Sequence, residues 1–522
     1  MKFGTQKTLI LIVALLLAVP TAASANRGQK SPKYVFFFLG DGMSATQIQA
    51  TEAYLTTFNG GDATVATDLA QSGNRLNMTQ MPAAGMQMTY DSFALMTDSA
   101  SSATAFSCGL KTQSGTIGMD AAKTMNFKSV AQLAKEQGKK VGVISSVSLN
   151  HATPAAMYAQ VPSRNDYKDI ALQAALSGYD FFGGGAFHKT DEETDAAFEA
   201  AGYTIVNTFD GIMDLYENPI DKVIASNPVL QDSNAMPYAI DTSNVDRFAD
   251  NLTLAEITDV AISVLSAQPK QQSEWHWGWH PWTKRKQHKQ DNGFFLFVEG
   301  GKIDWAGHAN DAMANIGDML DFDDAVGVAL DFYNQYPDDT LIVVTGDHET
   351  GGMTIGHATT GYSAHYETLL GQNMSFTEFG ISVLSAHKAE FGGANFTSLE
   401  SNSVAQDIML AYFGLDYSTL NGYQQEKLND AYQKSMTGAN GNSTDENKWL
   451  YAGYDPFTVT ITHVLNENAS IGWTSYSHTG VPVPLFATGV KADAFNGFYD
   501  NTDIAKKIAS IMGIRQQLPI AE

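Results

Sequence analysis

YVFFFLGDGM, from Tyr34 to Met43, begins with an unbroken apolar run, Tyr34–Leu39, which is followed by a glycine-bounded aspartate, Asp41. Three further largely apolar runs follow along the chain, at Lys140–Ser145, Phe294–Val298 and Thr340–Thr345. Apolar runs without alternation are typical of parallel strands that helices cover on both faces. Helical patterns separate the runs, as at Ser129–Glu136 and Met319–Tyr333. This alternation predicts an α/β fold, with a doubly wound, mostly parallel central sheet flanked by helices.

Polar side chains follow each of these expected strands. Glu299 comes directly after Val298, and Asp347-His348 comes one glycine after Thr345. The strand at 140–145 leads to a second polar segment, Asn150-His-Ala-Thr-Pro154, which we expect to close a turn. Ligands of open α/β sheets bind beyond the carboxyl ends of the strands. The sequence therefore predicts a site rich in metal ligands at one edge of the sheet.

Composition narrows the possible partners. The chain has 522 residues, 44% of them hydrophobic, and 31 Lys+Arg against 56 Asp+Glu give a net charge of -25. This acid excess argues against a nucleic-acid backbone or an anionic membrane as the main partner. The single cysteine, Cys108, excludes an intrachain disulfide and any multi-cysteine metal site, and we interpret it as a packing residue.

The N-terminus is typical of a secretory signal peptide. Lys2 and Lys7 precede an apolar run from Leu9 to Val19, and Ala23-Ser-Ala25 resembles a cleavage site. The run is too short to span a bilayer. We expect residues 1–25 to be removed, residues 26–522 to form the functional domain, and the product to be periplasmic or secreted with no membrane span.

Two stretches are expected to be insertions into this domain. Residues 271–290 contain four of the seven tryptophans, together with histidines and a run of Lys and Arg. A metal-binding surface loop and a tolerated or partner-facing insertion are both open interpretations. Residues 357–468 are polar and carry their own helical patterns, so we expect a peripheral subdomain or a dimer clasp.

A nucleophile candidate lies in Asp98-Ser99-Ala-Ser-Ser-Ala-Thr104, a run of small residues before Phe106. Small side chains leave a serine accessible at a helix N-terminus, where free N–H groups favour an anion. A serine becomes an effective nucleophile when a base or a metal lowers its pKa. A well-packed helix start is the alternative interpretation of this run.

Other candidates can bind metal or phosphate. Asp304 and His308 are four residues apart, so one helical face can present both to a metal ion. His478 precedes another expected strand, at Val483–Ala487. Arg164 can hold a phosphate through two N–H groups. Taken singly, each also fits an ordinary structural role.

These candidates form a set that suits one kind of chemistry. They comprise Asp41, Ser99, Thr153, Arg164, Glu299, Asp304, His308, Asp347, His348 and His478. Their oxygen and imidazole ligands suffice for two borderline metal ions, zinc or cobalt, and one hard ion. A serine, two zinc ions and an arginine suit phosphoryl transfer, because the metals stabilise the alkoxide and the leaving oxygen.

Five ordered motifs give the chain a resemblance to the alkaline phosphatase family. They are Phe38-Leu-Gly-Asp-Gly-Met43, Thr97-Asp-Ser-Ala-Ser-Ser-Ala-Thr104, Val298-Glu-Gly-Gly-Lys-Ile-Asp304, Thr345-Gly-Asp-His348 and Ser477-His-Thr-Gly480. The resemblance implies a phosphomonoesterase that forms a phosphoseryl intermediate on Ser99, with Arg164 on the phosphate oxygens and Asp98 positioning Arg164. It also implies one zinc on Asp304, His308 and His478, another on Asp41, Asp347 and His348, and magnesium on Asp41, Thr153 and Glu299.

Two further positions narrow the resemblance. His151 stands where the enterobacterial enzyme has an aspartate, and Trp305 stands where that enzyme has a lysine. This pair looks more like the marine Vibrio-type enzymes, which implies a cold-adapted homodimer with a long loop embracing the partner. We expect Asp98, His151 and Trp305 either to contact the substrate or to hold the residues that bind substrate and metal. We also expect Trp305 to make phosphate release easier.

Three other functions fit parts of the sequence. A diesterase or sulfatase on the same fold is disfavoured, because Glu299 with Thr153 indicates a third metal site and the serine motif differs from that of sulfatases. A silent phosphate- or metal-binding protein would not need an intact Ser99. Adhesion through residues 271–290 is compatible with catalysis.

Overall fold

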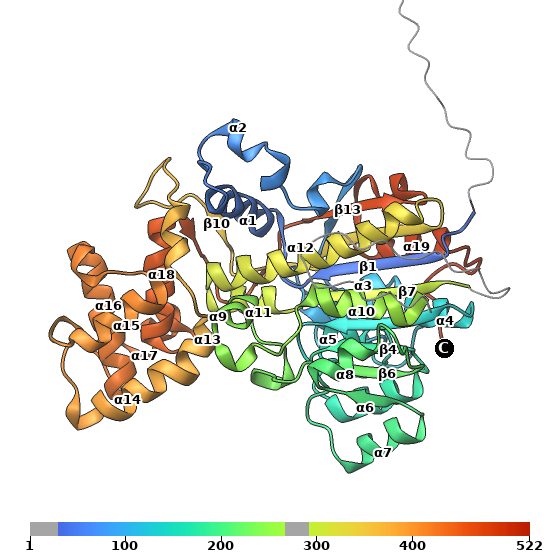
Figure 1. Ribbon diagram of the computed structural model, residues 1–522, viewed down its shortest axis with the longest axis horizontal. Coiled ribbons are helices and arrows are strands. Elements are labelled where there is room, and N and C mark those ends of the chain that lie inside the picture. Colours follow the sequence, from blue (N-terminus) through green and yellow to red (C-terminus); the bar gives the residue numbers. More distant parts are fainter. Residues whose placement is uncertain (1–29, 267–291) are drawn as a thin grey trace, which may run out of the picture.

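A ten-stranded sheet forms the centre of the molecule in the computed structural model, which describes residues 30–266 and 292–522 (Figure 1). The expected signal peptide and the insertion at 271–290 lie outside the described residues. In order across the sheet the strands are β14 (Gly497–Asp500), β2 (Ala83–Met88), β13 (Val483–Gly489), β8 (Thr340–Gly346), β1 (Tyr34–Gly40), β7 (Phe294–Gly300), β3 (Lys140–Ser145), β4 (Phe181–Gly184), β6 (Val223–Ser226) and β5 (Thr204–Val206).

β1 shows why the apolar runs contain no alternation. Every residue of this strand is buried. Val35, Phe37 and Leu39 belong to the hydrophobic cluster on one face of the sheet, and the intervening residues Tyr34, Phe36 and Phe38 belong to the cluster on the other. The predicted burial on both faces is therefore confirmed.

The sheet is mostly parallel, as predicted. β1 runs parallel to both β7 and β8, and β3 runs parallel to β7 and β4. β13 is the exception, because it pairs antiparallel with both β8 and β2. The apolar runs locate the four long parallel strands correctly, although β1, β7 and β8 extend one or two residues further than expected.

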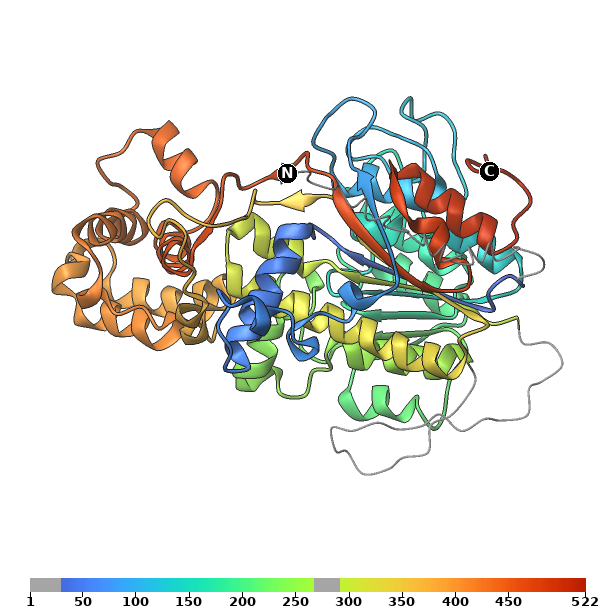
Figure 2. The same cartoon turned by 90° about the horizontal axis from the view of Figure 1, so that it is seen from above.

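Helices cover both faces of the sheet. One face packs against α3 (Ser99–Cys108), α4 (Val130–Glu136), α5 (Ala152–Ala155), α6 (Tyr167–Leu176) and α19 (Thr502–Ile511). The other packs against α8 (Phe209–Asp214), α10 (Leu254–Ser266) and α12 (Ala312–Gln335). The doubly wound architecture that the sequence predicts is thus confirmed (Figure 2).

A group of helices extends from one end of the sheet (Figures 1 and 2). It contains α13 (Phe376–Glu378), α14 (Ser385–Phe391), α15 (Ser403–Phe413), α16 (Gly422–Thr437), α17 (Thr444–Tyr451) and α18 (Pro456–Ala469). α15 ends at Gly414, which adopts the left-handed conformation that favours glycine (φ 64°). A core of its own packs this group against α1 (Ala45–Phe58) and α9 (Ala239–Asn244). Among the described residues, no helix combines the length and the apolar character that a membrane crossing requires.

Candidate active site

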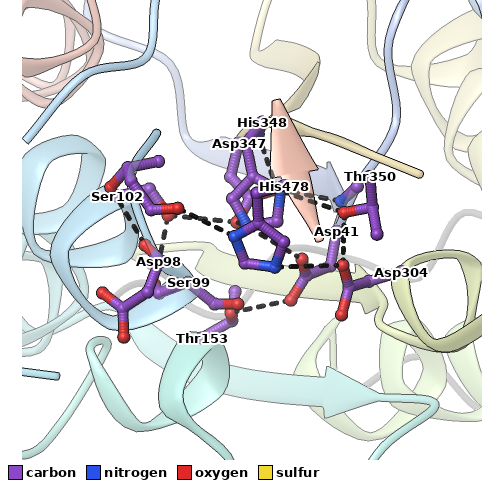
Figure 3. A network of polar contacts seen from close by, with 12 residues as sticks. Asp41, Asp98, Ser99, Ser102, Thr153, Asp304, Asp347, His348, Thr350 and His478 are labelled. Atoms are coloured by element: carbon purple, nitrogen blue, oxygen red, sulfur yellow. Dashed lines mark hydrogen bonds and ion pairs between the residues drawn. The ribbon is translucent and has the colours of Figure 1, made fainter. Parts of the chain in front are cut away.

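Three neighbouring strands bring acidic residues to the same edge of the sheet. Asp41 follows β1, Glu299 is the last residue but one of β7, and Asp347 follows β8. β1 lies between the other two strands, and Leu39 is in register with Glu299. Because the strands are parallel and end together, the Asp347 and Glu299 carboxylates both lie close to that of Asp41, as Figure 3 shows for Asp41 and Asp347.

Gly42 allows the chain after β1 to pass close to a second part of the site. Its φ is +75°, and a Cβ atom at this position would lie 2.9 Å from the Cα atom of Asp304. The Gly42 N–H donates to Oδ1 of Asp347 at 3.0 Å. The glycine after Asp41 is therefore needed both for its backbone conformation and for this close approach.

Ser99 is the first residue of α3, and Asp98 is its N-cap. Oδ1 of Asp98 accepts the backbone N–H of Ser101 at 3.0 Å. Ser99 is 2% exposed, and in the described part of the chain no hydrogen bond holds its hydroxyl group. The small residues pack the helix tightly, and they also leave the serine next to the metal-ligand candidates (Figure 3). The run is therefore both a well-packed helix start and a possible position for a nucleophile.

Arg164 is held by two partners at the edge of the site. Its Nη1 donates to Oδ2 of Asp98 at 3.0 Å, and its Nη2 lies 3.1 Å from Nε2 of His151. Burial raises the pKa of Asp98, but Arg164 and the backbone N–H groups of Ser101 and Gly115 outweigh it, so the net pKa is lowered. Asp98 is therefore an anion that orients the guanidinium group.

His308 and His478 each turn the Nε2 atom of the ring toward the Asp304 carboxylate. Nδ1 of His308 donates to the Tyr476 carbonyl at 2.7 Å, and Nδ1 of His478 donates to the Thr97 carbonyl at 2.8 Å. In the neutral form of each ring, Nε2 therefore carries a lone pair, and the two Nε2 atoms are 3.1 Å apart. They lie 3.4 and 3.5 Å from the Asp304 carboxylate. Two lone pairs and a carboxylate facing one point fit a zinc ion.

A second ligand set lies beside the first. Nε2 of His348 is 3.1 Å from Oδ2 of Asp347 and 3.5 Å from Oδ1 of Asp41. This Nε2 and Oδ1 of Asp41 are both buried without a hydrogen-bond partner. The His348 ring also stacks on His478, with 3.6 Å between the ring centres. Two buried acceptors without a partner, on Asp41 and His348 next to the Asp347 carboxylate, fit a second metal ion.

A third group of ligand candidates adjoins Asp41. Oδ2 of Asp41 accepts the Thr153 hydroxyl at 3.2 Å, and Oε1 of Glu299 is buried with no hydrogen-bond partner. His151 also has a ring nitrogen within 4.8 Å of ligand atoms of Asp41 and Glu299. The predominance of oxygen ligands fits a hard cation such as magnesium.

The turn expected at 150–154 is confirmed only at its start, where the His151 N–H donates to the Ser148 carbonyl at 2.8 Å. Ala152–Ala155 form α5, with His151 as its N-cap, so Thr153 points into the site from a helix. Pro154 is compatible with this helix because it lies in the first turn, where a backbone N–H has no intrahelical partner. The strand β3 itself contributes Ser145, whose hydroxyl donates to Glu299.

The site concentrates negative charge away from water. Burial raises the pKa of Asp41, and Asp347 and Asp304 raise it further. Burial likewise raises the pKa of Glu299 to about 8 and that of Asp347 to about 6. Carboxylates that repel one another in this way become stable anions when cations bind between them. The charge pattern therefore also fits bound metal ions.

Sequence reasoning missed the residues that hold these ligands in place. The Glu349 carboxylate accepts hydrogen bonds from the side-chain amide of Gln47 in α1, from the backbone N–H groups of Gly352 and Met353, and from the Thr479 hydroxyl. Thr350 donates to Asp304 and Ser102 donates to Asp347. Glu349 follows Asp347-His348 directly and Thr479 follows His478, so adjacency to a candidate ligand was the available signal.

Trp305 borders the Arg164 side of the site. It lies in α11 (Lys302–Ala309), its ring is 5.9 Å from that of His151 in an edge-to-face contact, and Nζ of Lys302 is 4.9 Å from its centre. Each residue that the sequence put forward for the site lies in the described chain, and the structure brings them together. Histidines within 271–290 lie outside the described residues.

Comparisons with known proteins agree on one family. A family model described as alkaline phosphatase matches residues 32–180 and 190–514. Alkaline phosphatase 4 of Bacillus subtilis is 29% identical over 502 residues, covering 94% of this chain and 91% of the relative. A cold-active alkaline phosphatase from the psychrophile Shewanella sp. has a TM-score of 0.68 and 28% identity, covering 92% of this chain and 99% of that one. The alkaline phosphatase of the Antarctic bacterium TAB5 has a TM-score of 0.59 and 25% identity, covering 94% and 100%.

Proposed function

Because this chain belongs to the alkaline phosphatase family and is a metal-dependent phosphoric monoester hydrolase, we propose that it acts through a phosphoserine intermediate on Ser99. The observation that carries this proposal is the position of Ser99 at the N-terminus of α3, beside two histidine–carboxylate sets (Figure 3). Free N–H groups at a helix N-terminus favour an anion there, as the phosphoryl group requires.

The covalent steps follow from this placement. The Ser99 Oγ atom attacks phosphorus, the bond from phosphorus to the ester oxygen breaks, and the departing alcohol takes up a proton. A water molecule then attacks the phosphoserine, the phosphorus–Oγ bond breaks, and Ser99 recovers its proton as phosphate leaves. Arg164 binds the non-bridging oxygens through N–H groups that Asp98 and His151 leave free.

We assign zinc to two ligand sets and magnesium to the third. One zinc is held by Asp304, His308 and His478, and the other by Asp41, Asp347 and His348. Magnesium is held by Asp41, Thr153 and Glu299. Metal ions at these positions lower the pKa of bound hydroxyl groups and stabilise the leaving oxygen.

Turnover of p-nitrophenyl phosphate tests the proposed function. We expect activity that rises from neutral to alkaline pH, falls more than about 100-fold on chelation, and returns when zinc and magnesium are both restored. Rate recovery with magnesium alone would contradict the zinc assignment. A fully metal-loaded protein without turnover would contradict the monoesterase, and diester substrates would then be tested.

Trp305→Lys is expected to tighten inhibition by inorganic phosphate about tenfold and to lower the turnover number. A lysine here would add a positive charge beside Arg164, so phosphate would leave more slowly. Trp305→Met is the matched control, because it removes the aromatic ring without adding charge. Inhibition constants from steady-state kinetics give the comparison, and equal constants for the two variants would contradict the charge effect.

We also propose export and dimer formation. Export is supported by the N-terminal segment 1–25, and mass spectrometry of the secreted protein would locate the cleavage site. The helices between 357 and 468 form a group with its own core beside the sheet, which supports a peripheral subdomain, and the resemblance to the Vibrio-type enzymes supports a clasp on a second copy. Sedimentation of the protein with and without this segment would test the clasp.

A further inference from the structure

A cavity of about 930 Å³ lies among the helices at the end of the molecule. Its walls come from α16, α17 and residues 473–476, in the region where these helices project beyond the sheet (Figure 1). Neither Ser99 nor any of the proposed metal ligands lines it. Its volume lies within the range of small-molecule sites, so it is a second place where a ligand fits.

Aromatic side chains form an accessible part of the wall. Trp449 is 76% exposed and Tyr423 is 65% exposed, although both are large apolar surfaces. Trp473 also lines the cavity, and its Nε1 atom is buried without a hydrogen-bond partner among the described residues. The wall therefore offers the flat apolar faces of Trp449 and Tyr423 to a ligand.

The charge of the wall is negative. Glu400, Glu426 and Glu446 line the cavity, and no ion pair within the described chain reaches their carboxylates. Lys427 is on the same wall, but its Nζ atom is bound to Glu467 at 2.7 Å. The cavity thus presents unpaired acceptors, and its field attracts a cation.

We propose that this cavity binds an amine-bearing oligosaccharide. A pyranose ring has an apolar face of C–H groups that stacks on the exposed rings of Trp449 and Tyr423. Protonated amino groups pair with the carboxylates and also interact favourably with aromatic faces. A simple alkylammonium ion offers no flat face to these aromatic rings, and a neutral sugar leaves the carboxylates without a charge partner.

The cavity is separate from the reaction centre, but two of its lining residues also contact residues next to the proposed metal ligands. Asn310 and Tyr476 line the cavity. The Tyr476 carbonyl accepts a hydrogen bond from Nδ1 of His308, and Nδ2 of Asn310 donates to the Ser475 carbonyl. The proposal does not depend on turnover, so binding is measured with phosphate saturating the active site.

Calorimetric titration of the metal-loaded protein with three disaccharides tests the proposal. The β-1,4 dimer of glucosamine, its N,N′-diacetyl form and cellobiose differ only at the second carbon of each ring. At physiological ionic strength, and at a pH where both amines are protonated, we expect the glucosamine dimer to bind at least about tenfold more tightly than the other two. Equal affinities, or no binding of the amine form, would overturn the proposal.

Two variants locate the binding. Trp449→Ala and Glu426→Gln are each expected to weaken binding of the glucosamine dimer at least about fivefold, with turnover unchanged. Glu192→Gln is the matched control, because it removes an exposed carboxylate from α7 (Glu192–Ala200), far from the cavity (Figure 1). Affinities that all three variants leave unchanged would show that the sugar binds elsewhere, whereas an equal loss in all three would indicate attraction to the overall negative charge.

Discussion

Ser99→Ala is expected to lower the turnover number for p-nitrophenyl phosphate by about 10⁴-fold or more. The alanine variant keeps the metal ligands and Arg164, so it still binds phosphate, but it lacks the oxygen atom that attacks phosphorus. Loss of a nucleophile in a preassembled site has effects of this order, because the remaining groups catalyse only slow direct attack by water. Steady-state kinetics on the metal-loaded variant measure the loss.

Acid quenching during turnover gives a second readout of the same variant. The intact protein should gain the mass of one phosphoryl group in the wild type and should gain none in Ser99→Ala. Ser107→Ala is the matched control, because Ser107 is a buried serine of the same helix whose hydroxyl contacts Cys108. A phosphorylated Ser99→Ala protein, or turnover within tenfold of the wild type, would assign the nucleophile to another residue.

Asp304→Asn is expected to remove one zinc ion per chain and to lower the turnover number by about 10³-fold or more. The substitution keeps the size of the side chain but removes the charge that faces both Nε2 atoms of His308 and His478. Without the carboxylate, two imidazole ligands remain in this set, and a neutral amide is a weak ligand for zinc. Metal content after dialysis and steady-state kinetics are the measurements.

Asp321→Asn is the control for loss of a carboxylate alone. Asp321 lies on α12 and accepts the backbone N–H of Leu254, so it supports the start of α10 and none of the metal-ligand sets. We expect this variant to retain all its metal and nearly all its turnover. The zinc assignment would be wrong if Asp304→Asn kept the metal content of the control.

Local patterns were sufficient to predict the strands that frame the site. Lys140–Ser145 was predicted with the bounds that the structure has, because an apolar run is a local signal. The acidic residues after β1 and β8 could be placed at one edge because parallel strands end together. The resemblance to one family supplied the assignment of those residues to particular metals.

Contacts between distant segments could not be predicted from one sequence. The insertion of β13 between β2 and β8 depends on how the complete sheet packs, and no local pattern encodes it. The same holds for the carbonyl groups of Thr97 and Tyr476, which fix the tautomers of His478 and His308. Main-chain acceptors are present at every residue, so composition and spacing carry no information about which one is used.

The place of β13 in the sheet also has a consequence for biosynthesis. β13 is among the last strands to leave the ribosome, yet β8 and β2 need it as their shared neighbour. At ~5–20 residues per second, translation from Asp41 to His478 takes on the order of 20–90 seconds. On the proposed metal assignment, the first ligand, Asp41, has then been made and the last, His478, has not. The assignment therefore predicts that a nascent chain hydrolyses no phosphate esters until its translation is nearly complete.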